Sequence, residues 1–97
     1  MATYIILISY TDQGIRNVKD SPKRLDAAKK LLKEMGGEFK QVYLTMGAYD
    51  IVTVVEAPSD EAIAKFALVV GSLGNIRTTT LKAFPEDEYR KIIAALP

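Results

Sequence analysis

Residues 39–57 read FKQVYLTMGAYDIVTVVEA, and this stretch decides the fold. Two runs rich in apolar and β-branched residues, Phe39–Met46 and Tyr49–Ala57, predict neighbouring strands. Only Gly47-Ala48 separates them, and a two-residue loop that begins with glycine is typical of a type II′ hairpin. The resulting register places one apolar set on the face that we expect to take the helices: Val42, Leu44, Met46, Tyr49, Ile51, Thr53 and Val55. The opposite face then carries Gln41, Tyr43, Thr45, Asp50, Val52, Val54 and Glu56.

The segment before this hairpin predicts a strand and a helix. Residues Thr3–Tyr10 are apolar at nearly every position, which indicates a strand buried on both faces. A helix is expected to begin at Ser21, a good N-cap residue, with Pro22 at its first position and Gly36-Gly37 after its end. Its apolar stripe comprises Leu25, Ala28, Leu32 and Met35, with Leu31 beside them.

The segment after the hairpin repeats the pattern. Pro58-Ser59 opens a helix that stops near Leu73-Gly74, and a threonine-rich strand is predicted over Asn75–Phe84. A short C-terminal helix begins at Pro85, with an expected inner side of Tyr89, Ile92, Ile93 and Leu96. The order of elements predicts an α+β, ferredoxin-like βαββαβ fold with a four-stranded antiparallel sheet plus a C-terminal helix. We expect residues 1–97 to form a single domain of this type.

The composition narrows the classes of function. The chain has 97 residues, 13 of them Lys or Arg and 12 Asp or Glu, with neither cysteine nor histidine. This balance gives no electrostatic reason to expect nucleic acid as a partner. Without cysteine and histidine the chain can form neither disulfides nor a Ser-His-Asp or Cys-His catalytic site. The common ligands of transition metals are also missing, so we expect no metal and no cofactor. The apolar N-terminus is too short for a membrane helix and lacks the flanks of a signal peptide, which predicts a cytoplasmic protein.

One sheet face lacks a cover in this fold. Both helices pack on one side, and the other side carries Tyr43, Val52 and Val54 together with one apolar set of the first strand. A bare patch of this kind exceeds what monomers usually expose. We therefore expect a homo-oligomer, a dimer or larger, in which two sheets pack face to face as a dimeric α+β barrel. The alternative is that the C-terminal helix folds back over its own sheet.

The connection Thr11–Asp20 is a first candidate site because it exceeds the usual two to six residues. Gln13, Arg16 and Lys19 offer an amide and two cations, and Arg24 just beyond is a third, which favours an anion-binding or substrate-closing loop. The alternative is a one-turn helix whose Ile15 and Val18 insert into the core.

A second candidate site lies on the uncovered face. Asp50 stands at a strand start, where it could bind an amine or act as a base with a raised pKa. The alternative is a cap on hairpin amides or an ion pair across the interface. Arg77 and Thr79 share a face of the last strand and could line a pocket with Asp50 and Tyr43. The alternative is that a threonine-rich strand is simply a good strand.

The motif Leu44-Thr45-Met46-Gly47-Ala48-Tyr49-Asp50-Ile51-Val52 resembles the namesake motif of GYD-domain proteins. Agreement extends upstream to the segment from Thr11 through Pro22, and downstream to Gly74–Thr80. The resemblance implies a relation to the dimeric α+β barrel superfamily. The order Gly-x-Tyr-Asp, strand, helix with an internal Phe, then Asn75-Ile76-Arg77-Thr78 is also similar to the effector-binding domain of leucine-responsive regulators, which dimerise and bind amino acids or similar ligands at subunit interfaces. The DNA-binding domain of those regulators is missing here.

Three functions remain open at the level of sequence. The first is a stand-alone oligomeric domain that binds a small, anionic or amino-acid-like molecule at the subunit interface. The second is a cofactor-free oxygenase or isomerase with Asp50 as base and Tyr43 or Arg77 stabilising an enolate. The third is a purely structural assembly unit.

Overall fold

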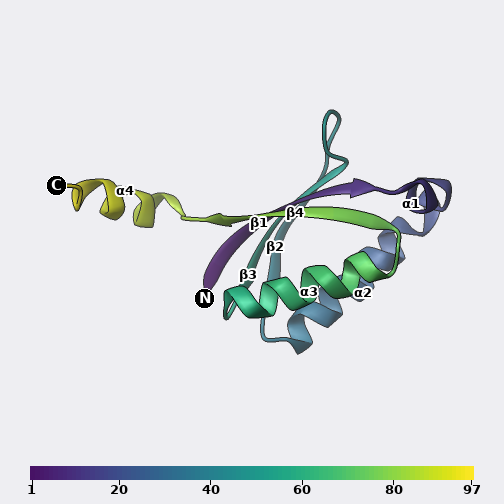
Figure 1. Cartoon of the computed structure of the whole chain (residues 1–97), viewed down its shortest axis with the longest axis horizontal. Helices are drawn as coiled ribbons and strands as arrows, with labels where there is room; N and C mark the ends of the chain where they lie inside the picture. The colour runs from purple at the N-terminus through teal and green to yellow at the C-terminus, as the bar shows by residue number, and fades with distance from the viewer.

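The computed structural model describes all of residues 1–97 as a four-stranded antiparallel sheet with two long helices on one face (Figure 1). The elements run in the order β1 (Ala2–Tyr10), α1 (Asp12–Arg16), η1 (Val18–Asp20), α2 (Ser21–Glu34), β2 (Glu38–Leu44), β3 (Ile51–Ala57), α3 (Asp60–Ser72), β4 (Ile76–Ala83) and α4 (Glu86–Ala94). The strand order is β2-β3-β1-β4, so β1 and β3 are central. The predicted ferredoxin-like α+β fold is confirmed. No helix has the length and apolarity needed to cross a membrane.

The core lies between the sheet and the inner faces of α2 and α3. Alternate residues of the central strands, such as Ile6 and Val55, are buried beneath Leu32 of α2 and Phe66 of α3. The stripe predicted for α2 therefore faces the sheet, and so do Ile63, Phe66 and Val70 of α3. Ser59 caps α3, because its side-chain oxygen accepts a hydrogen bond from the amide of Ala62 at 3.1 Å.

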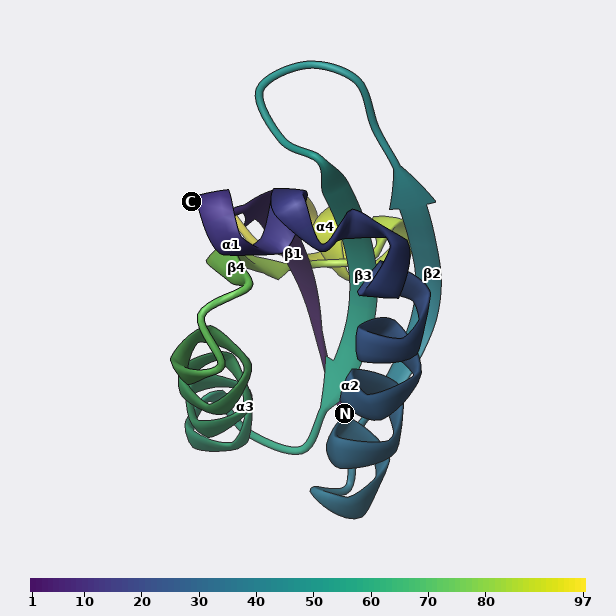
Figure 2. The same ribbon diagram turned by 90° about the vertical axis from the view of Figure 1, so that its right-hand side faces the viewer.

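The hairpin register is confirmed from Gln41 to Leu44, a bulge before Gln41 shifts the pairing of Phe39 by one residue, and the predicted turn is wrong. Val42 pairs with Thr53 and Leu44 with Ile51, as a loop centred on Gly47-Ala48 requires. However, pairing stops at Leu44 and resumes at Ile51, so residues 45–50 form a longer loop that extends beyond the sheet (Figure 2). Gly47 adopts φ +139°, which is far from the first central position of a type II′ turn.

The start of α2 differs from the expected cap. Ser21 is the first helical residue rather than the N-cap, and the preceding Asp20 makes no side-chain capping bond. The Ser21 hydroxyl instead shares a hydrogen bond of 2.8 Å with the Tyr10 hydroxyl at the end of β1. This serine therefore joins α2 to the sheet, and its own amide donates to the carbonyl of Val18.

The C-terminal helix does not cover the bare face of the sheet, so the alternative to a partner chain is wrong. α4 continues from β4 away from the sheet, as Figure 1 shows, so it does not fold back over the uncovered face. Its expected inner side is exposed at Tyr89, Ile92, Ile93 and Leu96. The helix is amphipathic as the sequence predicts, but no surface of the same chain covers its apolar side.

One polar contact holds the start of β1 to the start of α3. The buried Tyr4 hydroxyl donates a hydrogen bond to the carboxylate of Asp60, which also lies 3.3 Å from Lys82. The bond to Asp60, together with burial, raises the pKa of Tyr4 to about 12. The same bond, followed by the influence of Lys82, lowers the pKa of Asp60.

Tyr4→Phe is therefore expected to destabilise the protein in a pH-dependent way. The carboxylate form of Asp60 is favoured by folding, so its contribution is full above the unfolded pKa of about 3.9 and is lost in acid. The raised pKa of Tyr4 makes its contribution full below about pH 10 and lost toward pH 12. Urea unfolding should thus show the largest difference between wild type and variant from about pH 5 to 9. Tyr89→Phe, on exposed α4, is the control, and a Tyr4→Phe difference that is constant with pH contradicts the assignment.

Candidate functional site

The loop proposed as an anion-binding lid is a short helix fixed to the turn before β4. Thr11 caps α1 by accepting a hydrogen bond from the amide of Gly14 at 3.0 Å, and its own amide donates to the carbonyl of Asn75 at 3.0 Å. The Gln13 amide nitrogen donates to the side-chain oxygen of Asn75 at 2.9 Å. The segment is therefore helical, as the alternative reading expected. Ile15 and Val18 remain exposed, however, so their expected insertion into the core is wrong.

Asp50 completes the hydrogen bonding at the end of β1. Its carboxylate accepts a bond from the amide of Tyr10 at 2.8 Å, and its own amide donates to the carbonyl of Ile8 at 2.9 Å. Its carbonyl accepts from the amide of Thr45 at 2.8 Å, which closes the loop of residues 45–50. These bonds agree with the capping role that was one of the readings for Asp50, although the amide that its carboxylate caps belongs to β1 rather than to the hairpin.

The other predicted site residues lie on the uncovered face or at its margins. Tyr43, Val52, Leu7 and Thr79 form one row across all four strands. Tyr43 and Thr79 therefore occupy opposite edges, about 14 Å apart for three strand spacings. Arg77 lies on the same face two residues from Thr79 along β4.

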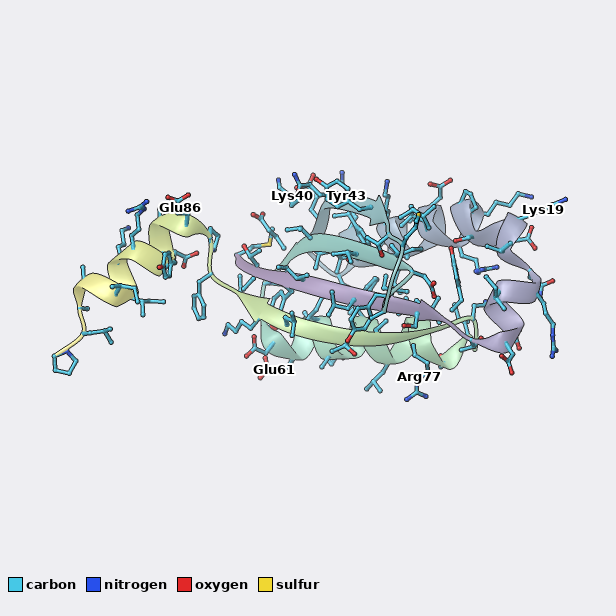
Figure 3. The ribbon with its side chains drawn as sticks, turned by 90° about the horizontal axis from the view of Figure 1, so that it is seen from above. Lys19, Lys40, Tyr43, Glu61, Arg77 and Glu86 are labelled. Carbon is cyan, nitrogen blue, oxygen red and sulfur yellow. The ribbon has the colours of Figure 1, made fainter.

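Within one chain, the seven predicted residues do not converge. Arg16 and Lys19 are exposed on α1 and η1. Figure 3 shows Lys19, Tyr43 and Arg77 at separate margins of the molecule. A ligand site that unites Gln13, Arg16, Lys19, Tyr43, Asp50, Arg77 and Thr79 at a subunit interface stays a prediction.

A cavity lies on the other face of the sheet, between α2 and α3. Its volume is about 400 Å³, and 13 of its 18 lining residues are hydrophobic. Ile6, Ile8 and Thr53 form part of its floor, while Leu25 and Leu31 of α2 and Phe66 and Val70 of α3 form its walls. This volume lies within the range of about 300–1,000 Å³ that is usual for small-molecule sites. None of the seven residues predicted from the sequence lines this cavity.

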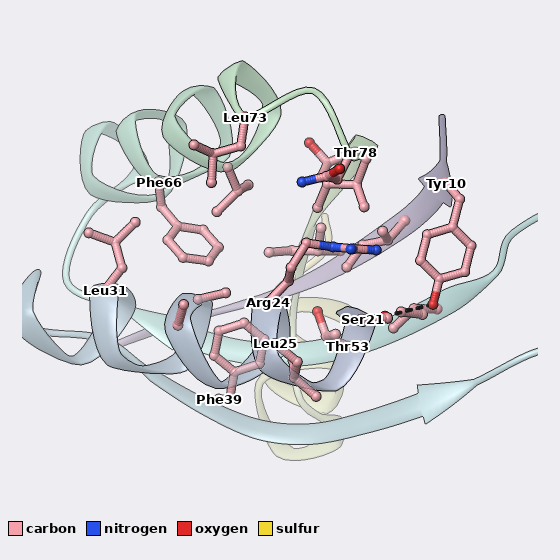
Figure 4. A pocket seen from close by; sticks show the side chains of 18 residues that line it. Tyr10, Ser21, Arg24, Leu25, Leu31, Phe39, Thr53, Phe66, Leu73 and Thr78 are labelled. Carbon is pink, nitrogen blue, oxygen red and sulfur yellow. Dashed lines mark hydrogen bonds between the residues drawn. The ribbon is translucent and has the colours of Figure 1, made fainter. Parts of the chain in front are cut away.

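The lining is divided into a polar end and an apolar end (Figure 4). Tyr10, Ser21, Arg24, Thr53 and Thr78 gather at one end, whereas Leu31 and Phe66 lie toward the other. The rings of Phe39 and Phe66 meet edge to face at 5.9 Å and close part of the apolar end. A molecule held here would keep a polar group at one end and an apolar body at the other.

The polar residues of the cavity gave only a weak signal in the sequence. Thr53 is the one polar residue at the alternating, helix-facing positions of β3 from Ile51 to Ala57. Its hydroxyl is fully buried and has no hydrogen-bond partner. A hydroxyl in that position costs free energy unless something satisfies it, which is the clue that could have pointed to a site.

Comparison with known proteins adds relatives of the same architecture. A protein of Thermus thermophilus named "Glutamine synthetase and cystathionine beta-lyase binding protein" is 34% identical over 86 residues, which cover 88% of this chain and 90% of the relative. The crystal structure of TTHA0845, also from Thermus thermophilus, is similar with a TM-score of 0.55 and 27% identity, covering 87% of this chain and 94% of that one.

A second solved structure, FFRP-DM1, gives a TM-score of 0.60 at 23% identity over 87% of this chain and all of that chain, and it supports the fold alone. The family model for the GYD domain matches residues 4–93. The match confirms the resemblance seen in the motif around Gly47-Ala48-Tyr49-Asp50, and this chain belongs to the GYD domain family.

Proposed function

We propose that this chain is a self-associating binding domain, formed by residues 1–97 as one unit, that holds a small molecule in the cavity between α2, α3 and the sheet. The observation that carries the proposal is the cavity of about 400 Å³ with its polar residues gathered at one end. Small-molecule sites usually combine a mostly apolar lining with a few polar groups that orient the ligand. The buried, unpartnered hydroxyl of Thr53 supports a ligand that supplies the missing hydrogen bond.

Filling the cavity tests this proposal. Ala28 lies on α2, lines the cavity and packs against the core, so Ala28→Phe should place a ring in the space that the ligand needs. Decanol and decanoate are suitable probes, and scanning calorimetry measures the melting temperature with and without each of them. When the free probe concentration is a hundred times the dissociation constant, binding raises the free energy of unfolding by about 2.7 kcal/mol. For a domain of this size, the melting temperature then rises by several degrees.

The expected result is a shift in the wild type that Ala28→Leu reduces and Ala28→Phe abolishes. Ala64→Phe is the matched control, because Ala64 is an exposed residue of α3 that does not line the cavity. The proposal fails if neither probe shifts the melting temperature of the wild type. It also fails if Ala28→Phe leaves the shift unchanged.

A second candidate function is the binding of a metabolic enzyme. The name of the Thermus thermophilus relative supports it, and so does the exposed sheet face that carries Tyr43 and Leu81. In that case a purified glutamine synthetase from the same organism would co-sediment with this chain. A substitution on the exposed sheet face would then abolish the contact, whereas Ala28→Phe would leave it intact.

A further inference from the structure

The charge of the cavity is set by a single side chain. Arg24 is the only charged residue among those that line it, and no Asp or Glu does so. An ammonium group would therefore meet one cation and no anion, whereas a carboxylate would meet a complementary charge. Because the cavity is mostly apolar, this single charge is screened less than it would be in water.

The guanidinium of Arg24 is already held in place. Its Nη1 donates to the carbonyl of Asn17 at 3.0 Å and its Nη2 donates to the carbonyl of Gly14 at 3.3 Å. A guanidinium has five N–H donors, so these two bonds leave others for a ligand. The carbonyls of the α1 segment thus orient the cation at the polar end of the cavity, and ligand binding need not order it.

Further donors surround the same end. Tyr10 and Ser21 share one hydrogen bond of 2.8 Å, so one of the two hydroxyl hydrogens stays available whichever group donates. Ser21 and Arg24 both belong to the first turn of α2, where the helix dipole favours negative charge. The hydroxyl of Thr53 is fully buried and unpartnered. The polar end therefore offers several donors and one positive charge, with no carboxylate.

From these observations we infer that the cavity takes an apolar molecule with one carboxylate head, such as an acyl or aryl monocarboxylate. The inference rests on the proposed small-molecule function and adds the chemical class of the ligand. The carboxylate lies against Arg24 and the Tyr10–Ser21 pair, and the apolar body runs toward Phe39 and Phe66. The residues concerned differ from those predicted on the uncovered sheet face.

Isothermal titration calorimetry with decanoate, decanol and decylamine, which have equal chain length, compares the contributions of the three head groups to affinity. Decanoate is expected to bind about tenfold or more tightly than decanol, because charge-assisted bonds exceed neutral ones, and decylamine is expected to bind least. Arg24→Gln should weaken decanoate about tenfold and leave decanol unchanged. Arg90→Gln is the matched control, since Arg90 is exposed on α4 outside the cavity.

A second variant guards against loss of structure when Arg24 is replaced. Thr53→Val conserves shape and removes only an unsatisfied hydroxyl, so the protein should fold at least as well, and decanoate should bind severalfold less tightly. Equal affinities for decanoate and decanol overturn the inference while leaving the binding function intact. So does an unchanged decanoate affinity in both Arg24→Gln and Thr53→Val. Failure of every probe to bind overturns the binding function itself.

Discussion

Gly14→Ala is expected to destabilise the protein by about 3 kcal/mol or more, although Ala is usually the better helix residue. A Cβ at position 14 would lie 1.9 Å from the carbonyl oxygen of Asn75 and 2.8 Å from its carbonyl carbon. These atoms belong to the backbone, so a rotamer change cannot relieve the clash. To avoid the clash, α1 and the turn at Asn75 would have to move apart, and this would break the hydrogen bonds that Thr11 and Gln13 make to the turn.

Gly71→Ala is the control in the same chain. Gly71 lies in α3, and an added Cβ there meets no atom within 4 Å. Alanine should stabilise this helix by about 0.5–1 kcal/mol, because it loses less backbone entropy than glycine. Urea unfolding of both variants measures the contrast. A Gly14→Ala protein within about 1 kcal/mol of wild type would show that α1 does not pack on the turn at Asn75.

The second large effect concerns association through the uncovered face of the sheet. Val54 lies on central β3 beside Ile5 of β1, on the face that no helix covers. If two sheets pack on this face, Val54→Lys buries two unpaired charges per symmetric dimer, at a cost of several kcal/mol. We expect the dissociation constant to rise at least a hundredfold, equivalent to about 2.7 kcal/mol. In a separated chain the lysine stays in water, so the fold should survive.

Light scattering and sedimentation at micromolar concentration measure this effect. The wild type should have the mass of a dimer or larger assembly, and Val54→Lys the mass of one chain. Leu68→Lys serves as the control, because Leu68 is exposed on the outer side of α3 and should not affect the mass. A monomeric wild type would contradict association through this face.

The hairpin shows how local sequence predicts pairing better than loop shape. Any loop centred on Gly47-Ala48 sets Leu44 opposite Ile51, so the register survived an incorrect turn type. At the end of the loop, the carboxylate of Asp50 accepts a hydrogen bond from Tyr10 of β1, a contact between residues 40 apart in sequence. Propensity rules describe neighbours along the chain and do not contain such contacts.

The cavity escaped prediction for a related reason. Its polar end combines Tyr10 of β1, Ser21 and Arg24 of α2, and Thr53 of β3, which are distant in sequence and meet only in the folded chain. Its volume depends on how far α2 and α3 separate, and apolar stripes do not encode that distance. The amphipathic sequence of α4 predicts that one side of the helix is covered. It does not indicate which surface covers that side, and within one chain the side is exposed.

A single layer of strands separates the cavity from the uncovered face. Ile6 and Thr53 form the cavity floor, while their sequence neighbours Ile5 and Val54 point to the opposite side. One backbone thus carries both surfaces, so if chains pair on this face, occupancy of the cavity and pairing are linked for any ligand that binds the two states unequally. A ligand that prefers the paired chains tenfold must strengthen pairing tenfold per site, and pairing must tighten that ligand by the same factor.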